Sequence, residues 1–244
     1  MNIFFEIHQG NRREGPGDSD STIHALSYLG NLPTDIRILD IGCGPGMQTI
    51  SLAKNIEGKI IALDTHQPYL DQLKNLAAKK HLSKRITVQH GSMFALKFDA
   101  ESFDIIWSEG AIYIIGFEKG LQEWKTFLKK GGYLVVSEIA WFREDLPVDL
   151  QQYWNKIYPN IKTVPDHLKI IRNADYRLVA HFRLPESAWW KNYYHPIEKK
   201  ILQLELKYSS DPEAMEIIQA EKAEIELFRK YSEFYGYEFY IMQK

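Results

Sequence analysis

Short apolar runs alternate with amphipathic stretches along the first 140 residues of the chain. A continuous apolar run of four to eight residues indicates a buried strand, and apolar positions three or four residues apart indicate a helix. By these criteria the predicted strands are Arg37–Ile41, Lys59–Leu63, Ile86–Gln89, Phe103–Ser108 and Tyr133–Glu138. The predicted helices are Gln48–Asn55, Pro68–Lys80 and Phe117–Leu128, the last ended by Gly131-Gly132. This alternation predicts a parallel sheet with helices on both faces and right-handed crossovers.

The pattern changes after Trp141. Four further helices are predicted at Leu146–Tyr158, Val164–Asp175, Glu186–Tyr208 and Pro212–Tyr235, and two further strands at Tyr176–Arg183 and Tyr237–Met242. The last helix has Asp211 as a candidate N-cap and Gly236 as a candidate C′ residue. The sequence has no internal repeat, so we expect one domain over 1–244, with a helical insertion or cap at 184–236.

Composition narrows the range of functions. The net charge of -2 gives no electrostatic reason to expect a nucleic-acid or anionic-membrane partner. No apolar run approaches the roughly 20 residues of a membrane helix, and the N-terminus lacks the basic-then-apolar order of a signal peptide. Cys43 is the only cysteine, which excludes an intrachain disulfide and a zinc site built from cysteines. We therefore expect a cytoplasmic protein.

A glycine-rich loop, Asp40-Ile41-Gly42-Cys43-Gly44-Pro45-Gly46, joins the first strand to the first helix of the sheet. Glycines allow the backbone to approach a ligand closely, and the following helix presents unpaired N–H groups. A dinucleotide fingerprint requires G-x-G-x-x-G/A, but Met47 stands at the third position of that fingerprint. The spacing here is G-x-G-x-G instead. A purely structural turn is the alternative interpretation of this loop.

Other polar residues follow the ends of later strands. Asp64 ends the second strand about 20 residues after the loop, where a carboxylate can accept hydrogen bonds from both ribose hydroxyls. Asp64 would serve NAD equally well, and a helix N-cap is its alternative role. Glu109 and Tyr113 follow the fourth strand, and Glu138 ends the fifth. Carboxyl ends of parallel strands meet at one edge of the sheet, so these residues are candidates for catalysis.

The glycine loop, the acid at Asp64 and the GGYLVVSE strand together resemble class I S-adenosylmethionine-dependent methyltransferases, near the ubiquinone/menaquinone-biosynthesis type. The segments WSEGAIYIIGFEKGL, LPESAWWKNYYHPIEKK and YGYEFYIMQK resemble a prokaryotic group within that class. The resemblance implies an α/β, Rossmann-like, mostly parallel sheet of seven strands with a reversed last strand at Tyr237–Met242.

The resemblance also assigns residues to S-adenosylmethionine. It implies that the loop wraps the methionine end of this cofactor through Asp40, Gly42, Cys43, Gly44 and Gly46. Ser92 and Met93, after the third strand, would lie at the adenine, where the class often has an aspartate. Glu109 would hold the cofactor's ammonium group or act as a base, and Tyr113 would flank the methyl group.

Two segments outside these motifs have open interpretations. The first 34 residues contain Arg12–Ser19 and a predicted helix at Thr22–Leu29. They form either a flap that brings Arg13 or a backbone N–H near the methionine carboxylate, or a mobile leader. The aromatic cluster at 189–195 either packs the inserted helix on the sheet or on a second subunit, as in a homodimer, or caps the acceptor pocket beside the sulfonium. His24, His167 and His181 have no ligand-like spacing, so no metal site is expected.

The predicted reaction is in-line transfer of a methyl group to a small-molecule acceptor. It demands orientation and exclusion of water, with a base only if the acceptor must lose a proton. An NAD(P)-dependent oxidoreductase is disfavoured by the glycine spacing. A non-catalytic cofactor-binding protein remains the other alternative. RNA methylation is disfavoured because the chain lacks a basic stripe and an Asn/Asp-Pro-Pro-Tyr/Phe motif.

Overall fold

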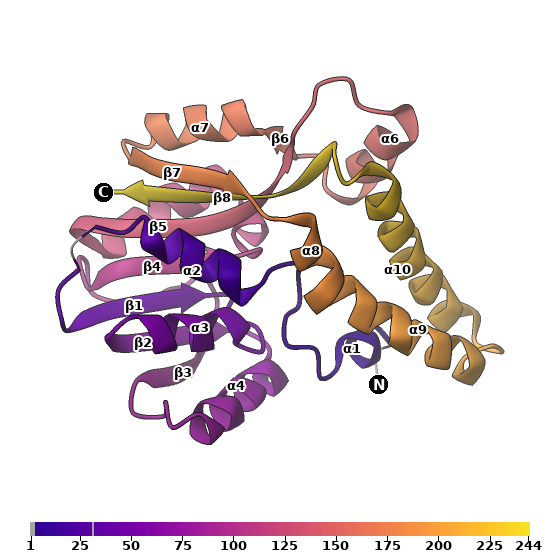
Figure 1. Cartoon of the computed structure of the whole chain (residues 1–244), viewed down its shortest axis with the longest axis horizontal. Helices are drawn as coiled ribbons and strands as arrows, with labels where there is room; N and C mark the ends of the chain where they lie inside the picture. The colour runs from indigo at the N-terminus through magenta and orange to yellow at the C-terminus, as the bar shows by residue number, and fades with distance from the viewer. Residues whose placement is uncertain (1–2, 31) are drawn as a thin grey trace.

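The core of the molecule is a single mixed sheet with helices on both faces (Figure 1). The computed structural model describes residues 3–30 and 32–244. The sheet order is β3-β2-β1-β4-β5-β8-β7, and β6 pairs beside β5 off this path. The strands are β1 (Ile36–Ile41), β2 (Gly58–Asp64), β3 (Ile86–His90), β4 (Phe103–Glu109), β5 (Leu128–Trp141), β6 (Lys162–Thr163), β7 (Arg177–Arg183) and β8 (Tyr235–Gln243).

The directions of the strands confirm the predicted fold class. The strands from β3 through β5 are parallel, whereas β8 is antiparallel to both of its neighbours, β5 and β7. The expected seven strands form the main path, and the two-residue β6 is an eighth that hydrophobic patterning does not reveal. The reversed strand, β8, lies in the interior of the sheet, between β5 and β7.

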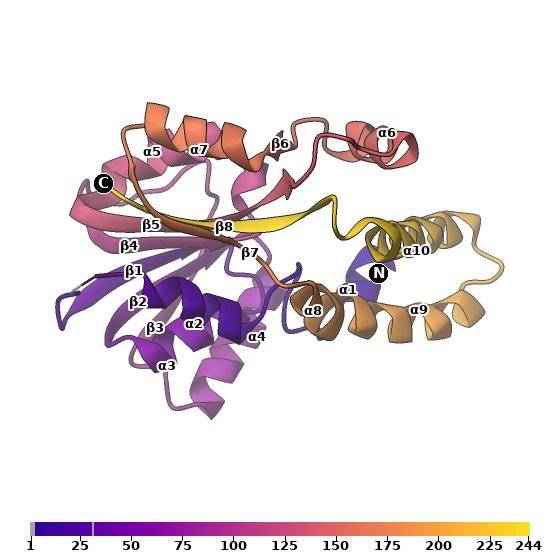
Figure 2. The ribbon, with the colours of Figure 1, turned by 45° about the horizontal axis from the view of Figure 1, so that its top comes forward.

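Two helical layers cover the sheet (Figure 2). One face carries α2 (Ser19–Ser27), α3 (Met47–Asn55) and α4 (Gln67–Lys79). The other carries α5 (Phe117–Trp124), which continues into the short turn Lys125–Phe127, and α7 (Val164–Asn173). Strand side chains alternate between these layers: Ile105 and Trp107 pack in one core, and Ile106 packs in the other.

A helical arm extends beyond the edge of the sheet (Figure 1). It consists of α8 (Glu186–Trp189), a π-helical turn (Trp190–Tyr194), α9 (His195–Lys207) and α10 (Pro212–Tyr231). The N-terminal helix α1 (Ile3–His8) packs against α9 and α10. The helix α6 (Val148–Ile157) follows β5, and the one-turn helix Ile112–Ile114 follows β4.

Some predicted boundaries were wrong. The prediction of one helix over Glu186–Tyr208 missed the π-helical turn. Gly236 is not a C′ residue, because α10 ends at Tyr231 and Gly236 pairs with Ala140 inside β8. Gly131-Gly132 do not end a helix, because β5 begins at Leu128 and includes them. The first of these glycines has φ +76° and lies where the pairing of β4 with β5 shifts register, so the pair accommodates an irregularity in the strand.

Candidate cofactor and acceptor site

The glycine loop turns sharply between β1 and α3. Gly42, Gly44 and Gly46 have φ values of +71°, +51° and +91°, which residues with a Cβ rarely adopt. The N–H groups of Gly42 and Cys43 donate to the carbonyl of Leu63 at 2.8 and 3.0 Å. These bonds fasten the loop to the end of β2, so the loop and Asp64 have a fixed relative position.

A cavity of about 500 Å³ opens beside this loop. It is lined by Gly42, Cys43, Gly44, Pro45 and Gln48 from the loop, by Asp64, His66 and Tyr69 after β2, by Ser92, Met93 and Phe94 after β3, and by Glu109, Gly110, Ala111, Tyr113 and Ile114 after β4. Phe4, Phe5 and the segment Arg13–Pro16 close another side. The cavity therefore lies at the carboxyl ends of the strands, the usual ligand site of doubly wound sheets.

Asp64 faces this cavity as expected for a ribose ligand. Its Oδ2 accepts the N–H of Gly44 at 2.9 Å, and its Oδ1 accepts the N–H of His66 at 2.9 Å. A carboxylate oxygen has two lone pairs, so each can still accept a ligand hydroxyl. The backbone bonds fix the orientation of the carboxylate. The alternative role as a helix N-cap is not seen, because the N-cap of α4 is His66 and no side chain caps that helix.

Two predicted cofactor residues, Asp40 and Gly46, do not line the cavity. Asp40 is fully buried in β1, where its Oδ2 accepts the hydroxyl of Thr49 at 2.5 Å and its Oδ1 has no partner among the described residues. Burial raises the pKa of Asp40 to about 7. Gly46 begins α3, and a Cβ there would lie 2.2 Å from Cδ1 of Leu73. Both residues therefore pack within the protein on the side of the loop that faces away from the cavity.

Ser92 and Met93 form the wall below β3. The hydroxyl of Ser92 accepts the N–H of Phe94 at 3.2 Å, and Met93 is buried. The terminal methyl group of Met93 would lie 3.9 Å from a Cβ at Gly42, so the two residues are close across the cavity. Their position suits a flat apolar group with a polar edge.

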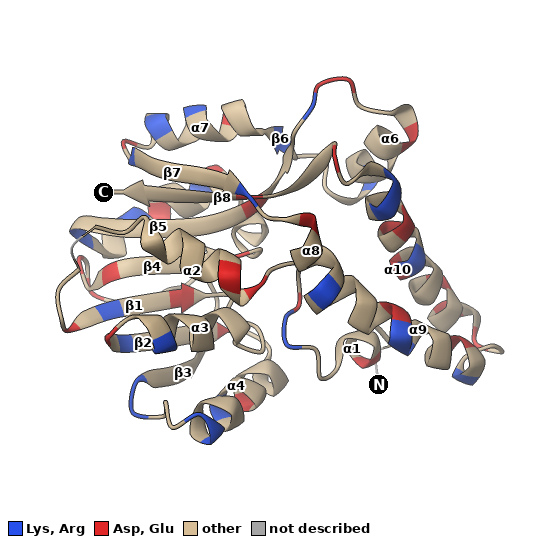
Figure 3. Cartoon of the chain, viewed as in Figure 1, with Lys and Arg blue, Asp and Glu red and all other residues tan. Residues whose placement is uncertain are grey.

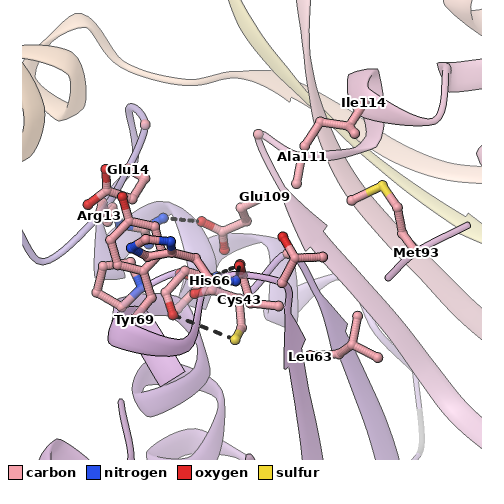
Figure 4. Close-up of a pocket in the computed structure, with 18 of the residues that line it drawn as sticks. Arg13, Glu14, Cys43, Leu63, His66, Tyr69, Met93, Glu109, Ala111 and Ile114 are labelled. Carbon is pink, nitrogen blue, oxygen red and sulfur yellow. Dashed lines mark hydrogen bonds and ion pairs between the residues drawn. The ribbon is translucent and has the colours of Figure 1, made fainter. Parts of the chain in front are cut away.

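Glu109 is bound by three donors. Nη1 of Arg13 lies 2.6 Å from its Oε2, while the hydroxyl of Thr22 and the indole N–H of Trp107 donate to its Oε1 at 2.7 and 2.9 Å. Figure 4 shows Arg13 reaching Glu109 across the mouth of the site. The predicted flap thus contacts the edge of the sheet beside the cavity through Arg13, whose Nε is buried without a partner among the described residues.

Tyr113 lies on the one-turn helix after β4 and is 44% exposed at the wall of the cavity. Its ring meets that of Tyr158 edge to face, with centroids 5.8 Å apart. Burial, with smaller effects of Glu138 and Glu224, raises the pKa of Tyr113. Its hydroxyl is therefore neutral at physiological pH and suited to hydrogen bonding.

Residues that the sequence motifs did not reveal close the cavity from the N-terminal side. Phe5 on α1 stacks on the ring of His66, with centroids 4.5 Å apart and planes 4° apart. Nδ1 of the buried His8 lies 3.0 Å from Oε2 of Glu14, and its Nε2 lies 3.6 Å from Oε1 of Glu221 on α10. The aromatic pattern of Ile3–His8 is the only sequence signal for this helix, and it is too short to give a periodicity.

The aromatic cluster at 189–195 divides between two environments. Trp189 stacks on Phe228 with centroids 4.2 Å apart, and Tyr194 is buried and donates to Glu224 at 3.0 Å. These two residues pack the arm together. Tyr193 instead lies beside His8, with ring centroids 5.9 Å apart, and so borders the N-terminal segment.

The strand order, the loop after β1 and the carboxylate after β2 define a doubly wound α/β protein with a site for a ribose-containing cofactor. A family model described as a methyltransferase domain matches residues 33–201, and the chain belongs to this family.

Individual relatives agree with this family. A sterol 24-C-methyltransferase of Neurospora crassa is 24% identical over 71% of this chain and 48% of its own length. A methyltransferase of Schizosaccharomyces pombe is 31% identical over 42% of this chain and 39% of its own length. The chain thus spans less than half the length of these curated relatives.

Solved structures match over almost the whole chain. A SAM-dependent methyltransferase from Geobacter sulfurreducens, solved with S-adenosyl-L-homocysteine, has a TM-score of 0.85 at 18% identity, covering 99% of this chain and 97% of its own. The [4+2]-cyclase SpnF has a TM-score of 0.76 at 17% identity, covering 99% and 92%. These likenesses establish the fold.

Within the described residues, 3–30 and 32–244, no three His, Cys, Asp or Glu residues gather as metal ligands. None of the helices described there is both long and apolar enough to cross a membrane.

Proposed function

We propose that this protein transfers a methyl group from S-adenosylmethionine to a small-molecule acceptor. The observation that carries the proposal is the placement of Asp64 and the loop Gly42–Gly44 on one cavity, with backbone bonds fixing both. Asp64 would hold the ribose hydroxyls, Ser92 and Met93 the adenine, and the loop the methionine end. Family membership and the structure solved with S-adenosyl-L-homocysteine support this choice of cofactor.

Arg13 supplies a positive charge at the methionine end. Its Nη1 is held by Glu109, while its Nε remains without a partner among the described residues. We propose that the guanidinium of Arg13, which borders the cavity, lies near the cofactor's carboxylate. Glu109 then serves to position Arg13, and its two carboxylate oxygens are already bound by three donors.

The chemistry needs little from the protein beyond this arrangement. A sulfonium is an activated leaving group, so the acceptor attacks the methyl carbon in line while the carbon–sulfur bond breaks. Holding the reactants in such a geometry supplies roughly 7–11 kcal/mol. The charged residues drawn in Figure 3 are of both signs and interspersed over the elements, which supports a small-molecule acceptor over a polyanion.

Calorimetric titration with S-adenosylhomocysteine tests the cofactor assignment. We expect the Asp64→Asn variant to lose at least 10-fold in affinity. The substitution removes the negative charge and replaces one carboxylate oxygen, which accepts a ribose hydroxyl, by an amide NH₂ group, which donates. The matched control Asp71→Asn alters an exposed residue of α4 and should leave the affinity unchanged. Binding of NADH in place of S-adenosylhomocysteine would overturn the proposal. Release of S-adenosylhomocysteine in the presence of an acceptor then distinguishes turnover from binding alone.

A further inference from the structure

A carboxyl group with one unpaired oxygen is buried beside the cofactor cavity. Glu138 lies in β5, is 1% exposed, and its Oε2 has no hydrogen-bond partner among the described residues. It follows Ser137, whose carbonyl and hydroxyl accept the N–H of Gly110 at 3.2 and 2.9 Å. Gly110 itself lines the cavity. Glu138 is therefore one residue from the wall at which the methyl acceptor would enter.

Three tyrosines lie near this carboxyl group, and one of them, Tyr237, pairs across the sheet with Ile139, the residue that follows Glu138. Tyr113 and Tyr158 meet edge to face, and Tyr237 lies against Gly110, where an added Cβ would be 3.0 Å from the ring. Burial raises the pKa values of all three hydroxyls, and the negative charge of Glu138 raises each of them further. The carboxyl group thus acts on three phenol rings that come from separate segments of the chain.

A second carboxyl group approaches from the helical arm. Glu224 on α10 accepts the hydroxyl of Tyr194, and burial, with the neighbouring Glu221, raises its pKa to about 7. Its charge also acts on Tyr113 and Tyr237. We call Tyr113, Glu138, Tyr158, Glu224 and Tyr237 the tyrosine–glutamate cluster.

No member of the cluster carries a positive charge, although His8 acts on Glu224 from outside it. Neither Glu138 nor Glu224 belongs to an ion pair in the part of the chain that the structure describes. The nearby cations are already engaged, since Arg13 pairs with Glu109 and His8 with Glu14. A buried carboxylate without a counter-charge is costly, and tyrosine rings attract cations through their faces. An organic ammonium group satisfies both features.

We propose that the tyrosine–glutamate cluster binds the methyl acceptor as a small organic amine, with Glu138 contacting its nitrogen. This inference rests on the proposed methyltransferase function and names its acceptor class. An ammonium acceptor would first transfer a proton from nitrogen to the Glu138 carboxylate. The freed lone pair then forms the nitrogen–carbon bond as the methyl–sulfur bond breaks, and the bonding pair stays on sulfur to give S-adenosylhomocysteine. Because burial raises the pKa of Glu138 to about 8, its ionised form is a stronger base toward an ammonium group than an ordinary carboxylate.

Three probes with one carbon skeleton test the preference for an amine. The full-length protein, saturated with S-adenosylhomocysteine, is titrated with 2-phenylethylamine, 2-phenylethanol and phenylacetate. We expect the amine to bind at least 10-fold more tightly than the alcohol or the acid. In Glu138→Gln the amine should lose at least 10-fold in affinity and the alcohol less than 2-fold. The matched control Glu144→Gln changes an exposed carboxylate just after β5 and should alter neither.

The results separate this inference from the proposed function. Affinity for S-adenosylhomocysteine within 2-fold of the wild-type value shows that Glu138→Gln retains its fold and cofactor site. Four results would overturn the inference. Three concern the wild-type protein: equal binding of amine and alcohol, preferred binding of phenylacetate, or no binding of any probe. The fourth is an amine preference that survives in Glu138→Gln. Failure of the wild-type protein to bind S-adenosylhomocysteine would overturn the proposed function instead, and the same titrations without it would still test the amine preference.

Discussion

The guanidinium of Arg13 and the carboxylate of Glu109 form an ion pair of 2.6 Å between residues 96 positions apart in the sequence. Both side chains are almost completely buried, at 4% and 2% exposed. Arg13 belongs to the segment before α2, and Glu109 ends β4. The pair therefore fastens the N-terminal segment to the edge of the sheet at which the cofactor is proposed to bind.

Replacement of Glu109 by glutamine should destabilise the protein and weaken cofactor binding. The substitution keeps the shape but leaves Arg13 buried without a counter-charge, which typically costs about 3–5 kcal/mol. Urea denaturation measures the free energy of unfolding, and titration with S-adenosylhomocysteine measures the affinity. Asp145→Asn, which breaks an exposed pair with Arg143, is the control and should change neither quantity. A Glu109→Gln variant as stable as the wild type would show that the pair does not hold the segment.

Replacement of Gly42 by alanine should disrupt the loop. A Cβ at Gly42 would lie 2.5 Å from the Cβ of Ala111, and the φ of +71° costs a further 1–2 kcal/mol or so for a residue with a side chain. We expect the affinity for S-adenosylhomocysteine to fall at least 10-fold. Gly10→Ala is the matched control, because Gly10 has φ +78° but no atom within 4 Å of its added Cβ. Gly10→Ala has the energetic cost of a positive φ but no steric clash, and it should bind S-adenosylhomocysteine with the wild-type affinity.

The stability of the protein should fall at alkaline pH through His8. Burial lowers the pKa of His8, but the neighbouring carboxylates of Glu14 and Glu221 outweigh this effect and raise the pKa from 6.5 to about 9. The stabilisation is complete below pH 6.5, where His8 is protonated in both states, and is lost as the pH rises through 9; it amounts to at most about 3 kcal/mol. Melting temperatures between pH 6 and 10 should fall more for the wild type than for His8→Gln. Parallel curves would contradict the prediction.

Replacement of Glu138 by glutamine should stabilise the protein at high pH. Burial raises the pKa of Glu138 from 4.5 to about 8, so between these values the native state binds more protons than the unfolded state. The contribution of Glu138 to the free energy of unfolding is therefore fully present below pH 4.5 and is lost as the pH rises through 8. Glutamine does not titrate, so Glu138→Gln should melt higher than the wild type at pH 9, with a smaller difference at pH 5. A lower melting temperature at pH 9 would show that the carboxylate has an unrecognised partner.

Local patterns predicted the sheet better than the arm. The apolar runs gave β1 to β5 because buried parallel strands are continuous apolar segments, and Gly42 to Gly46 marked the loop because its φ values exclude other residues. The two-residue β6 has too few residues to give a pattern. The π-helical turn at Trp190–Tyr194 interrupts a sequence whose helical periodicity continues through it.

The candidate site was predicted only where a motif is local. Asp64 follows its strand directly, so its position is set by β2. The contacts of Arg13, His8 and Phe5 join segments separated by tens to hundreds of residues, and no periodicity encodes such pairs. Asp40 was assigned to the cofactor from its place in the loop motif, but its side chain points into the protein, where burial isolates it from the cavity.

The position of β8 has a consequence for synthesis. This strand spans Tyr235–Gln243 yet lies between β5 and β7, which precede it by many residues. While the ribosome is still translating α9 and α10, both flanking strands have an unpaired edge, and exposed edges of this kind promote association between chains. Residues 235–243 therefore pair with β5 and β7 only after both of these strands have been synthesised. A nascent chain arrested before residue 235 is the species that chaperones would need to protect.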